Sequence, residues 1–232
     1  MKPIHIALSG SKGRMGQCVQ EAVSQNTQYV LSAEFFTAQS DRERAQALEN
    51  PIDVWVDFSN PTASLLYCEL CRKNGWKMVI GTTGFSEAQK ALIVEAAKEI
   101  PIVLAPNMSI GNALMLKILA ILGQSTIDCD VGIIDVHHKH KKDAPSGTAL
   151  AMAKVINAAK PTGGMHADIV SLRLGESIGE HQVLFALKDE SINITHTVHH
   201  RKVFAEGVLK AAAWLMNIQK PGLYGMQDVL NI

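Results

Sequence analysis

The sequence has few of the features that mark exported, redox-active or zinc-binding proteins. Its 232 residues include only four cysteines, and of these only Cys68 and Cys71 are close enough to share one face of a helix. A second closely spaced pair, which a zinc or redox centre would need, is lacking. We therefore expect free thiols and no metal ion. Since no export signal precedes the first strand-like segment, we also expect a cytoplasmic protein.

Charge of one sign and long apolar runs are also lacking. Lys+Arg and Asp+Glu each number 22, so the net charge is zero and provides no general attraction for nucleic acid or an anionic membrane. The most apolar stretch, residues 113–122, is too short to span a bilayer and contains Lys117. We expect neither nucleic acid nor a membrane as a partner. The remaining composition, 47% hydrophobic and 19% charged, is that of an ordinary globular protein with one large or two modest domains.

The first part of the chain alternates strand-like and helix-like segments. Strands are expected at residues 4–8, 29–36, 54–58, 77–80 and 102–104, and helices at residues 17–23, 41–48, 61–73 and after the capping box of Ser86 and Gln89. This alternation predicts an α/β fold with a doubly wound parallel sheet of the Rossmann-like kind. Ligands of such sheets bind at the carboxyl ends of the strands.

A glycine-rich loop, Gly10-Ser11-Lys12-Gly13-Arg14-Met15-Gly16, joins the first strand to the first helix. Strand, glycine loop and helix at the start of such a fold are typical of dinucleotide binding. The glycine spacing departs from the standard fingerprint, and glycines also serve plain turns. The loop alone therefore leaves both interpretations open.

The pattern changes after residue 112. A helix to about residue 123 is followed by strand-like runs at residues 131–137, 168–174, 181–187 and 191–198, and helices are expected at residues 148–159 and 203–218. The turns at residues 175–179 and 188–190 predict antiparallel neighbours. We expect a second α+β domain built on a mixed, open sheet.

The most unusual stretch is His137-His138-Lys139-His140-Lys141-Lys142-Asp143-Ala144-Pro145-Ser146-Gly147-Thr148. Three interpretations compete: a solvated basic loop, a metal site, and a site for a small dianion with acid/base groups. The spacing of the histidines fits no usual zinc pattern. The segment Pro-Ser-Gly-Thr, with Ser146 or Thr148 as the N-cap, opens a helix whose N–H groups are able to hold an anion, and this favours the third interpretation.

The same stretch, His-His-x-x-Lys-x-Asp-Ala-Pro-Ser-Gly-Thr-Ala, closely resembles the signature of the dihydrodipicolinate reductase family. Gly-x-x-Gly-Arg-Met-Gly also resembles the glycine loop of that family, and the resemblance covers nearly the whole chain. It implies reduction of 4-hydroxy-tetrahydrodipicolinate (dihydrodipicolinate), a cyclic dicarboxylate, to tetrahydrodipicolinate by NADH or NADPH, in lysine and diaminopimelate biosynthesis. It further implies a homotetramer.

The resemblance also implies roles for individual residues. His137 is the acid/base residue, Lys141 the proton donor and His138 a substrate-binding residue, while Ser146, Gly147 and Thr148 receive a substrate carboxylate. The cofactor contacts are Gly10, Ser11, Lys12, Gly13, Arg14, Met15, Gly81, Thr82, Thr83, Ala105, Pro106, Asn107 and Met108. Residues 1–108, completed by residues 203–232, form the dinucleotide-binding domain, and residues 109–202 bind substrate and join the subunits.

Two points stay open at this stage. The acid at the end of the second strand, Glu34, lies about two residues earlier than in the family, and Lys12 and Arg14 are available to neutralise the 2′-phosphate of NADPH. Dehydrogenases of other small dicarboxylates, such as aspartate, share the fold. A non-catalytic sensor that binds a dinucleotide is the remaining alternative.

Overall fold

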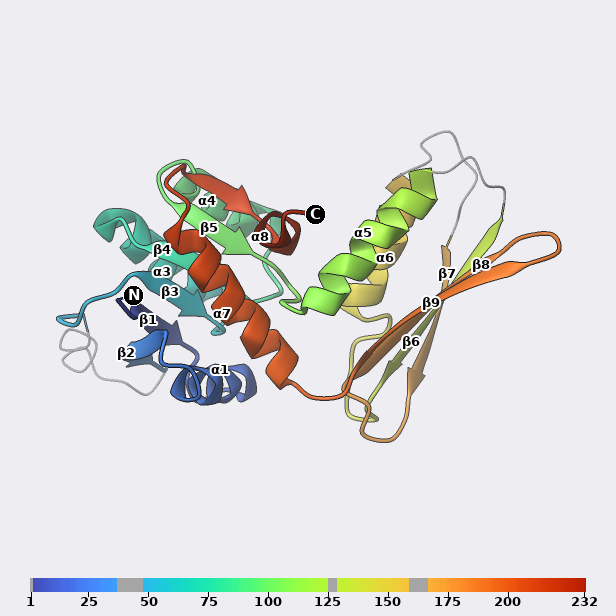
Figure 1. The fold of residues 1–232 in the computed structure, drawn as a ribbon, viewed down its shortest axis with the longest axis horizontal. Helices are drawn as coiled ribbons and strands as arrows, with labels where there is room; N and C mark the ends of the chain where they lie inside the picture. The colour runs from blue at the N-terminus through green and yellow to red at the C-terminus, as the bar shows by residue number, and fades with distance from the viewer. Residues whose placement is uncertain (1, 37–47, 125–128, 159–166) are drawn as a thin grey trace. The chain divides into compact units, whose positions relative to one another are not determined.

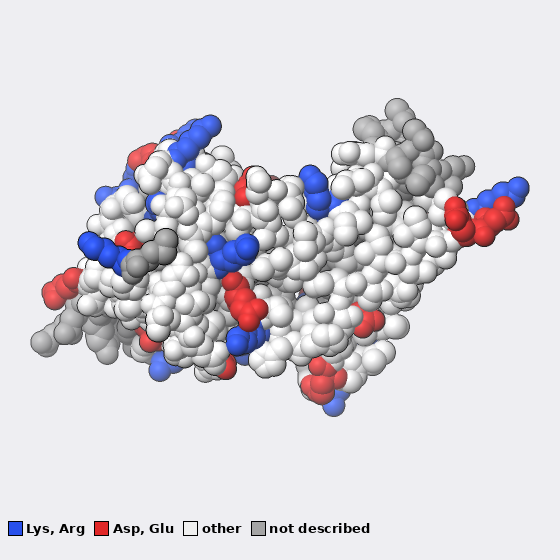
Figure 2. Space-filling model, viewed as in Figure 1, with Lys and Arg blue, Asp and Glu red and all other residues white. Residues whose placement is uncertain are grey.

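The computed structural model describes residues 2–36, 48–124, 129–158 and 167–232, and the chain forms two compact units. The first contains Met1–Ser109 and Lys202–Asn231, and the second contains Ile110–Arg201. Figure 1 shows the elements of each unit. Among the described residues, no helix is both long and apolar enough to cross a membrane. On the face displayed in Figure 2, basic and acidic side chains are interspersed.

The first unit is built on a six-stranded parallel sheet in the order β10-β5-β4-β3-β1-β2. Its strands are β1 (Ile4–Ser9), β2 (Tyr29–Phe35), β3 (Val54–Asp57), β4 (Lys77–Ile80), β5 (Pro101–Leu104) and β10 (Gly222–Tyr224). Its helices are α1 (Arg14–Ser24), α3 (Pro61–Asn74), α4 (Glu87–Ala96), α7 (Lys202–Met216) and α8 (Met226–Leu230). The predicted parallel Rossmann-like sheet is confirmed.

The central strands of this sheet are buried because helices cover both faces. All four residues of β3 are buried. Trp55 packs with Phe35 and with residues of α3 and α4 on one face, while α1 and α7 lie against each other elsewhere in the unit. The capping box of Ser86 and Gln89 is present at the start of α4, as predicted.

The second unit has a four-stranded sheet in the order β7-β6-β8-β9. Its elements are α5 (Ile110–Gln124), β6 (Asp130–His137), α6 (Gly147–Ala158), β7 (Ala167–Arg173), β8 (Gly179–Ala186) and β9 (Ser191–Val198). Helices α5 and α6 pack on one face of the sheet, where their apolar residues form a core with Val131, Ile133 and Val183 (Figure 1). The predicted mixed sheet is confirmed.

One local prediction was wrong. Strands β7 and β8 are not antiparallel neighbours: β7 pairs parallel to β6, β8 pairs antiparallel to the other edge of β6, and only β8 and β9 form a hairpin pair. Helix α6 lies between β6 and β7 in the chain, and a crossover connection of this kind is what parallel neighbours need. The short elements β10 and α8 lie beyond the last predicted helix, at residues 203–218, and were not predicted. The helix expected at residues 41–48 falls almost entirely outside the described residues.

Candidate active site

Three loops of the first unit lie at the carboxyl ends of strands of the one parallel sheet. The glycine loop follows β1, residues 81–83 follow β4, and residues 105–108 follow β5. All expected cofactor contacts belong to these loops or to the first turn of α1. The carboxyl edge of such a sheet is where dinucleotides bind.

Two glycines allow the glycine loop to fold tightly. Gly10 has a positive φ of 78°, and a Cβ atom there would lie 2.2 Å from the carbonyl oxygen of Phe58. A Cβ atom at Gly16 would lie 2.3 Å from the carbonyl oxygen of Gly10. Larger residues at either position would push the loop away from the sheet, so this sequence permits a close approach between backbone and ligand.

Asp57, at the end of β3, ties the strand ends together. It is fully buried and accepts hydrogen bonds from the hydroxyls of Ser9 (2.5 Å), Ser59 (2.5 Å) and Thr82 (2.6 Å). Ser9 directly precedes the glycine loop, and Thr82 belongs to the loop after β4. The carboxylate therefore fixes two of the three candidate cofactor loops relative to each other.

A cavity of about 570 Å³ opens beside the glycine loop. Gly10, Lys12 and Gly13 line one part of it, and aromatic rings that include Phe36 and Tyr67 line another. The Nζ atom of Lys12 lies 5.0 Å from the centre of the Phe36 ring. An aromatic cavity beside a glycine loop fits the adenosine half of a dinucleotide, with a cation at its rim.

Glu34 does not line this cavity. Its carboxylate accepts a hydrogen bond of 2.5 Å from the side-chain amide of Gln20 in α1. Among the described residues, those that line the cavity include no carboxylate. The displaced acid therefore does not mark the ribose position in the way that an acid at a strand end usually does.

The second unit holds the histidine- and lysine-rich loop between β6 and α6. His137 is the last residue of β6, and α6 begins at Gly147. The hydroxyl of Ser146 accepts a hydrogen bond of 3.1 Å from the N–H of Ala149, so Ser146 is the N-cap. Gly147 and Thr148 form the first turn, where helical N–H groups lack carbonyl partners within the helix.

The loop is held on both sides. The N–H of His138 donates a hydrogen bond of 2.7 Å to the carbonyl of Ser177, and Arg173 donates one of 2.6 Å to the carbonyl of Asp143. The Nζ atom of Lys141 lies 2.7 Å from a carboxylate oxygen of Asp143. Lys141 is thus held by an ion pair within the loop.

A buried polar cluster lies beneath the loop. Nδ1 of His137 lies 2.9 Å from Oδ1 of Asp135, and Nε2 of His181 lies 3.3 Å from the same oxygen. The other oxygen of Asp135 accepts hydrogen bonds from the N–H of Ser146 (2.9 Å), the hydroxyl of Ser171 (3.1 Å) and the guanidinium of Arg173 (3.0 Å).

The cluster controls the charge of its members. Burial opposes ionisation of Asp135, but hydrogen bonds from Ser146 and Arg173 outweigh it and hold the pKa of Asp135 at about 2. Burial lowers the pKa of His181 to about 4 and also lowers the pKa of His137, against the opposite effect of the Asp135 charge. At neutral pH the site therefore contains an ionised Asp135 and two neutral imidazoles.

Sequence reasoning missed Arg173 and His181, which come from β7 and β8 and lie beside β6 only in the folded sheet. The sequence did contain a local signal that Asp135 belongs to the site. It precedes His137 by two residues, so the period of a strand places both on one face.

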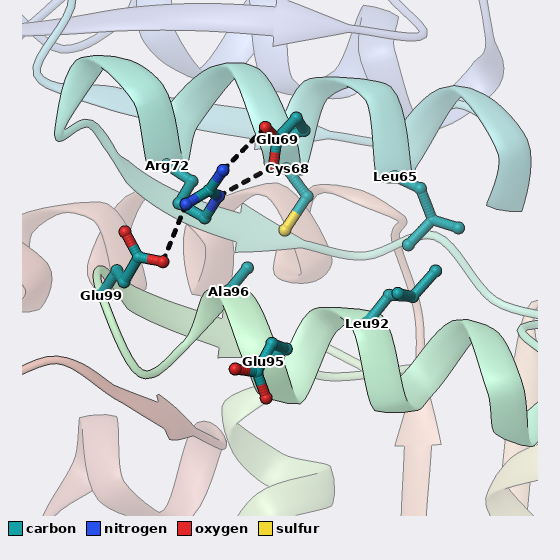
Figure 3. A pocket seen from close by; sticks show the side chains of 8 residues that line it. All are labelled: Leu65, Cys68, Glu69, Arg72, Leu92, Glu95, Ala96 and Glu99. Carbon is teal, nitrogen blue, oxygen red and sulfur yellow. Dashed lines mark hydrogen bonds and ion pairs between the residues drawn. The ribbon is translucent and has the colours of Figure 1, made fainter.

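A second hollow of the first unit, about 440 Å³ in volume, lies between α3 and α4 (Figure 3). Its one arginine, Arg72, already binds Glu69 and Glu99 at 2.8 Å each. Leu65 and Leu92 face each other across it. Its charged side chains already pair with one another or with neighbouring lysines, and we assign this groove no function.

The parallel sheet, its glycine loop and the adjoining aromatic cavity define a dinucleotide-binding protein. The family profile described as dihydrodipicolinate reductase, N-terminus, matches residues 4–108, and the profile for the C-terminus of that reductase matches residues 111–230. The chain belongs to the dihydrodipicolinate reductase family, as its two sequence motifs predicted.

Individual relatives agree over their whole lengths. The 4-hydroxy-tetrahydrodipicolinate reductase of Hahella chejuensis is 40% identical over 98% of this chain and 98% of its own, and that of Nitrosomonas europaea is 39% identical over 100% of both. A dipicolinate-bound dihydrodipicolinate reductase from Paenisporosarcina sp. TG-14 superimposes with a TM-score of 0.83 at 26% identity, covering 98% of this chain and 99% of that one.

More distant structures share the fold alone. The aspartate dehydrogenase of Thermotoga maritima has a TM-score of 0.51 at 11% identity, covering 94% of this chain and 98% of that one. The Rossmann-like fold is thus common to enzymes with different substrates, and the substrate has to be argued from the loop between β6 and α6.

Proposed function

We propose that the protein reduces 4-hydroxy-tetrahydrodipicolinate to tetrahydrodipicolinate with a nicotinamide cofactor, as a step of lysine and diaminopimelate biosynthesis. The observation that carries this proposal is the loop between β6 and α6, where a buried imidazole, a lysine and a helix N-terminus come from one short stretch of sequence. Family membership and the names of its full-length relatives support the same reaction.

The start of α6 suits one carboxylate of the substrate. The N–H groups of Gly147 and Thr148 belong to the first turn, where the helix dipole favours an anion. Ser146 is buried as the N-cap, so its role in our proposal is to orient this turn and to add its hydroxyl at the edge of the site. His138, half-buried at the start of the loop, contacts the same substrate.

Lys141 and His137 divide the remaining chemistry. Lys141 exchanges Asp143 for a substrate carboxylate and gives a proton to the reduced ring. His137 is neutral at pH 7 because burial lowers its pKa, so its ring is able to take up or release a proton during turnover. The cofactor, when bound, would supply the hydride, and the 4-hydroxyl group of the substrate leaves as water, so that one hydride and one proton complete the reduction.

The cofactor is a nicotinamide dinucleotide, since the chain belongs to a reductase family and the first unit has the matching fold. We propose that the glycine loop holds its pyrophosphate and that residues 81–83 and 105–108 lie on the nicotinamide side. The cavity lined by Gly10, Phe36 and Tyr67 suits the adenosine. Because positions 10 and 16 are glycines, no side chain there keeps a ligand away from the backbone of the loop.

We further propose that NADH and NADPH both serve. Glu34 is bound to Gln20 and does not line the cavity, so the carboxylate that favours NADH is not in place, and Lys12 at the rim attracts a 2′-phosphate. Comparable kcat/KM values are expected, and Lys12→Ala should weaken the use of NADPH more than that of NADH. A preference beyond about a hundredfold, roughly 2.7 kcal/mol, contradicts dual use.

One assay tests the function. 4-Hydroxy-tetrahydrodipicolinate is generated enzymatically, and the oxidation of NADH and of NADPH is followed at 340 nm with and without it. Substrate-dependent oxidation is expected with both. If neither cofactor is oxidised while the protein still binds it, the chain is a dinucleotide-binding sensor. If aspartate with NAD(P)⁺ is turned over instead, the substrate assignment is wrong.

We also propose that the two units have separate tasks, cofactor binding in the first and substrate binding with subunit assembly in the second. The sheet face opposite α5 and α6 is apolar along part of β6 and β7, with Val170 and Leu172 exposed on it. Open sheet faces of this kind are stable when another layer covers them. A homotetramer formed through this face follows, in agreement with the resemblance to the family.

A further inference from the structure

Asp135 is the most deeply buried charged group beneath the loop, and the reaction described above gives it no task. It is 0% exposed, yet its two oxygens are used differently. Oδ2 accepts three hydrogen bonds, from Ser146, Ser171 and Arg173. Oδ1 lies 2.9 Å from Nδ1 of His137 and 3.3 Å from Nε2 of His181, and neither contact has the alignment of a good hydrogen bond.

The register of the sheet explains this arrangement. Val131, Ile133, Asp135 and His137 alternate along β6 and face the core. In the neighbouring strands Asp135 is paired with Ser171 of β7 and His181 of β8, and His137 is paired with Arg173 of β7. The core face of the sheet therefore changes from apolar to polar at Asp135, beside the N-terminus of α6. A Cβ atom at Gly179 would lie 3.1 Å from Nε2 of His137, so a larger residue at this position of β8 would crowd the ring.

An apolar core is the usual alternative to a buried charge at such a position. A buried carboxylate with several polar partners is seldom more stable than an apolar core of the same volume. Two of its neighbours, His137 and His181, are uncharged at neutral pH because burial lowers the pKa of each. The attraction between Asp135 and the ring of His137 is therefore small when His137 is neutral and becomes large when His137 holds an extra proton.

A metal ion is the other chemistry that this cluster suggests. Asp135, His137 and His181 offer ligand atoms within 4.8 Å of one another. However, the guanidinium of Arg173 lies 3.0 Å from Oδ2 of Asp135, so a fixed positive charge already neutralises the carboxylate. A divalent cation there would repel Arg173 at close range in a site of low polarity, and this disfavours the metal.

We propose that Asp135 is a positioning residue that holds the ring of His137 through Nδ1 and the N-terminus of α6 through the N–H of Ser146. This inference rests on the proposed function, because it concerns the same acid/base residue and the same carboxylate-binding turn. The carboxylate of Asp135 thereby fixes the position of the His137 ring relative to the start of α6. A substrate bound at α6 then meets His137 with its ring already oriented.

The proposal fixes the tautomer of His137. The ring carries its proton on Nδ1, toward Oδ1 of Asp135, and Nε2 is the atom that exchanges a proton in the reaction. Arg173 of β7 and Lys141 of the loop oppose protonation of the ring, and Asp135 favours it. Removing the carboxylate should therefore disturb the tautomer and lower the pKa of His137 together.

The test combines kinetics with NMR on full-length protein with ¹⁵N-labelled histidine side chains. The resonances of His137 are assigned by their loss in His137→Gln. In the wild-type protein at pH 7, the ¹⁵N shifts should show a proton on Nδ1. In Asp135→Asn this preference should be lost, the pKa of His137 should fall, and kcat should drop roughly 10²-fold. The KM for NADPH should stay within about twofold of the wild-type value, because the candidate cofactor loops belong to the other unit.

Ile133→Ala serves as the matched control. Ile133 lies on the same strand and the same face, two residues before Asp135, inside the apolar core. The variant should lose stability by cavity formation but keep the Nδ1 tautomer and the pKa of His137. If Asp135→Asn loses activity with the tautomer and the pKa unchanged, the role of Asp135 is structural and the proposal is overturned. Retention of kcat within threefold overturns it as well.

Two further measurements keep the outcomes distinct. If Asp135→Asn does not fold, the wild-type spectrum decides, since a proton on Nε2 of His137 contradicts the proposal. One equivalent of zinc per chain in the purified protein also contradicts it, because the metal would replace the proton on Nδ1. Failure of the proposed function is recognised separately, as an inactive wild-type protein whose His137 still has the Nδ1 tautomer.

Discussion

At the scale of single residues, His137 and Lys141 have different surroundings and therefore different expected tasks. His137 is buried at the end of β6, and Lys141 is partly exposed in an ion pair with Asp143. An exposed cation contributes to binding the substrate in its ground state and to the transition state alike. A buried, neutral imidazole contributes chiefly when a proton moves.

Substitution should separate these tasks. Lys141→Ala is expected to raise KM and lower kcat, whereas His137→Gln should mainly lower kcat, by roughly 10²–10⁴-fold. Neither change should alter cofactor affinity measured by fluorescence titration. In the double variant the two losses should not add, because both residues act on one proton transfer. A normal kcat for His137→Gln at pH 7 would mean that the loop only clamps an anion.

His181 gives a prediction about stability and pH. Burial lowers its pKa to about 4 in the folded protein, compared with roughly 6.5 when it is exposed in the unfolded chain. The unfolded chain therefore binds a proton more tightly, and the stability that a neutral His181 allows is complete above roughly pH 6.5 and declines toward pH 4. Between pH 7 and pH 5 the loss should be about 2 kcal/mol.

Urea unfolding at several pH values measures this effect. His181→Asn should reduce the dependence of the unfolding free energy on pH over this range, whatever its stability at pH 7. In His181→Asn a smaller dependence of the same sign should remain, because burial also lowers the pKa of His137. An unchanged slope in His181→Asn would show that the ring is not buried in its neutral form.

At the scale of helices and strands, α7 approaches the candidate cofactor loop after β5 unusually closely. A Cβ atom at Gly207 would lie 1.8 Å from the carbonyl oxygen of Met108. In an ordinary helix, replacing glycine by alanine stabilises by about 1 kcal/mol. Here the added methyl group meets backbone, which cannot move aside as a side chain does, so overpacking should outweigh helix propensity.

Gly207→Ala is therefore expected to destabilise the protein by about 1–3 kcal/mol and to raise the KM for NADPH, because Met108 and its neighbours shift. Lys210→Ala, on the exposed side of the same helix, is the control and should change neither quantity appreciably. Thermal unfolding and steady-state kinetics measure both effects. A higher melting temperature for Gly207→Ala would contradict the close contact.

The elements also show how far sequence patterns reach. Local signals predicted most strands and helices of both units, since apolar periodicity and capping residues such as Ser86 and Gln89 lie within the segment they define. Pairing depends on residues far apart in the chain, so the parallel pairing of β7 with β6 was missed. Strand β10 has three residues, too few for a period to be recognised.

The residues of the candidate site likewise fall into those that sequence patterns predicted and those that they missed. The loop of residues 137–148 was recognised because its histidines, lysines and helix cap are contiguous. Arg173 and His181 were not, because each stands alone in an ordinary strand and reaches Asp135 only through the register of the sheet. A motif therefore predicts the residues that touch substrate better than those that hold them in place.

At the scale of the whole molecule, we propose that the outer face of the second sheet carries the contacts between chains. Val170 and Ile134 are paired neighbours on β7 and β6, and Leu172 lies beside Val136, all on the face opposite α5 and α6. Val170 is 57% exposed and Leu172 is 40% exposed in the single chain. Exposure of adjoining apolar side chains to water is unfavourable, and this cost is removed when a second sheet covers them.

We expect a homotetramer at micromolar concentration, measured by sedimentation velocity. Leu172→Arg should place a charge in the covered face and yield a smaller species that keeps its circular dichroism spectrum, because the side chain is exposed in each chain. Leu92→Arg, at an exposed leucine of α4 in the other unit, should leave the tetramer intact. A stable wild-type monomer would refute the assembly. A tetramer that survives Leu172→Arg unchanged would place the contacts on another surface. An unpaired arginine buried in an apolar interface would destabilise that interface strongly.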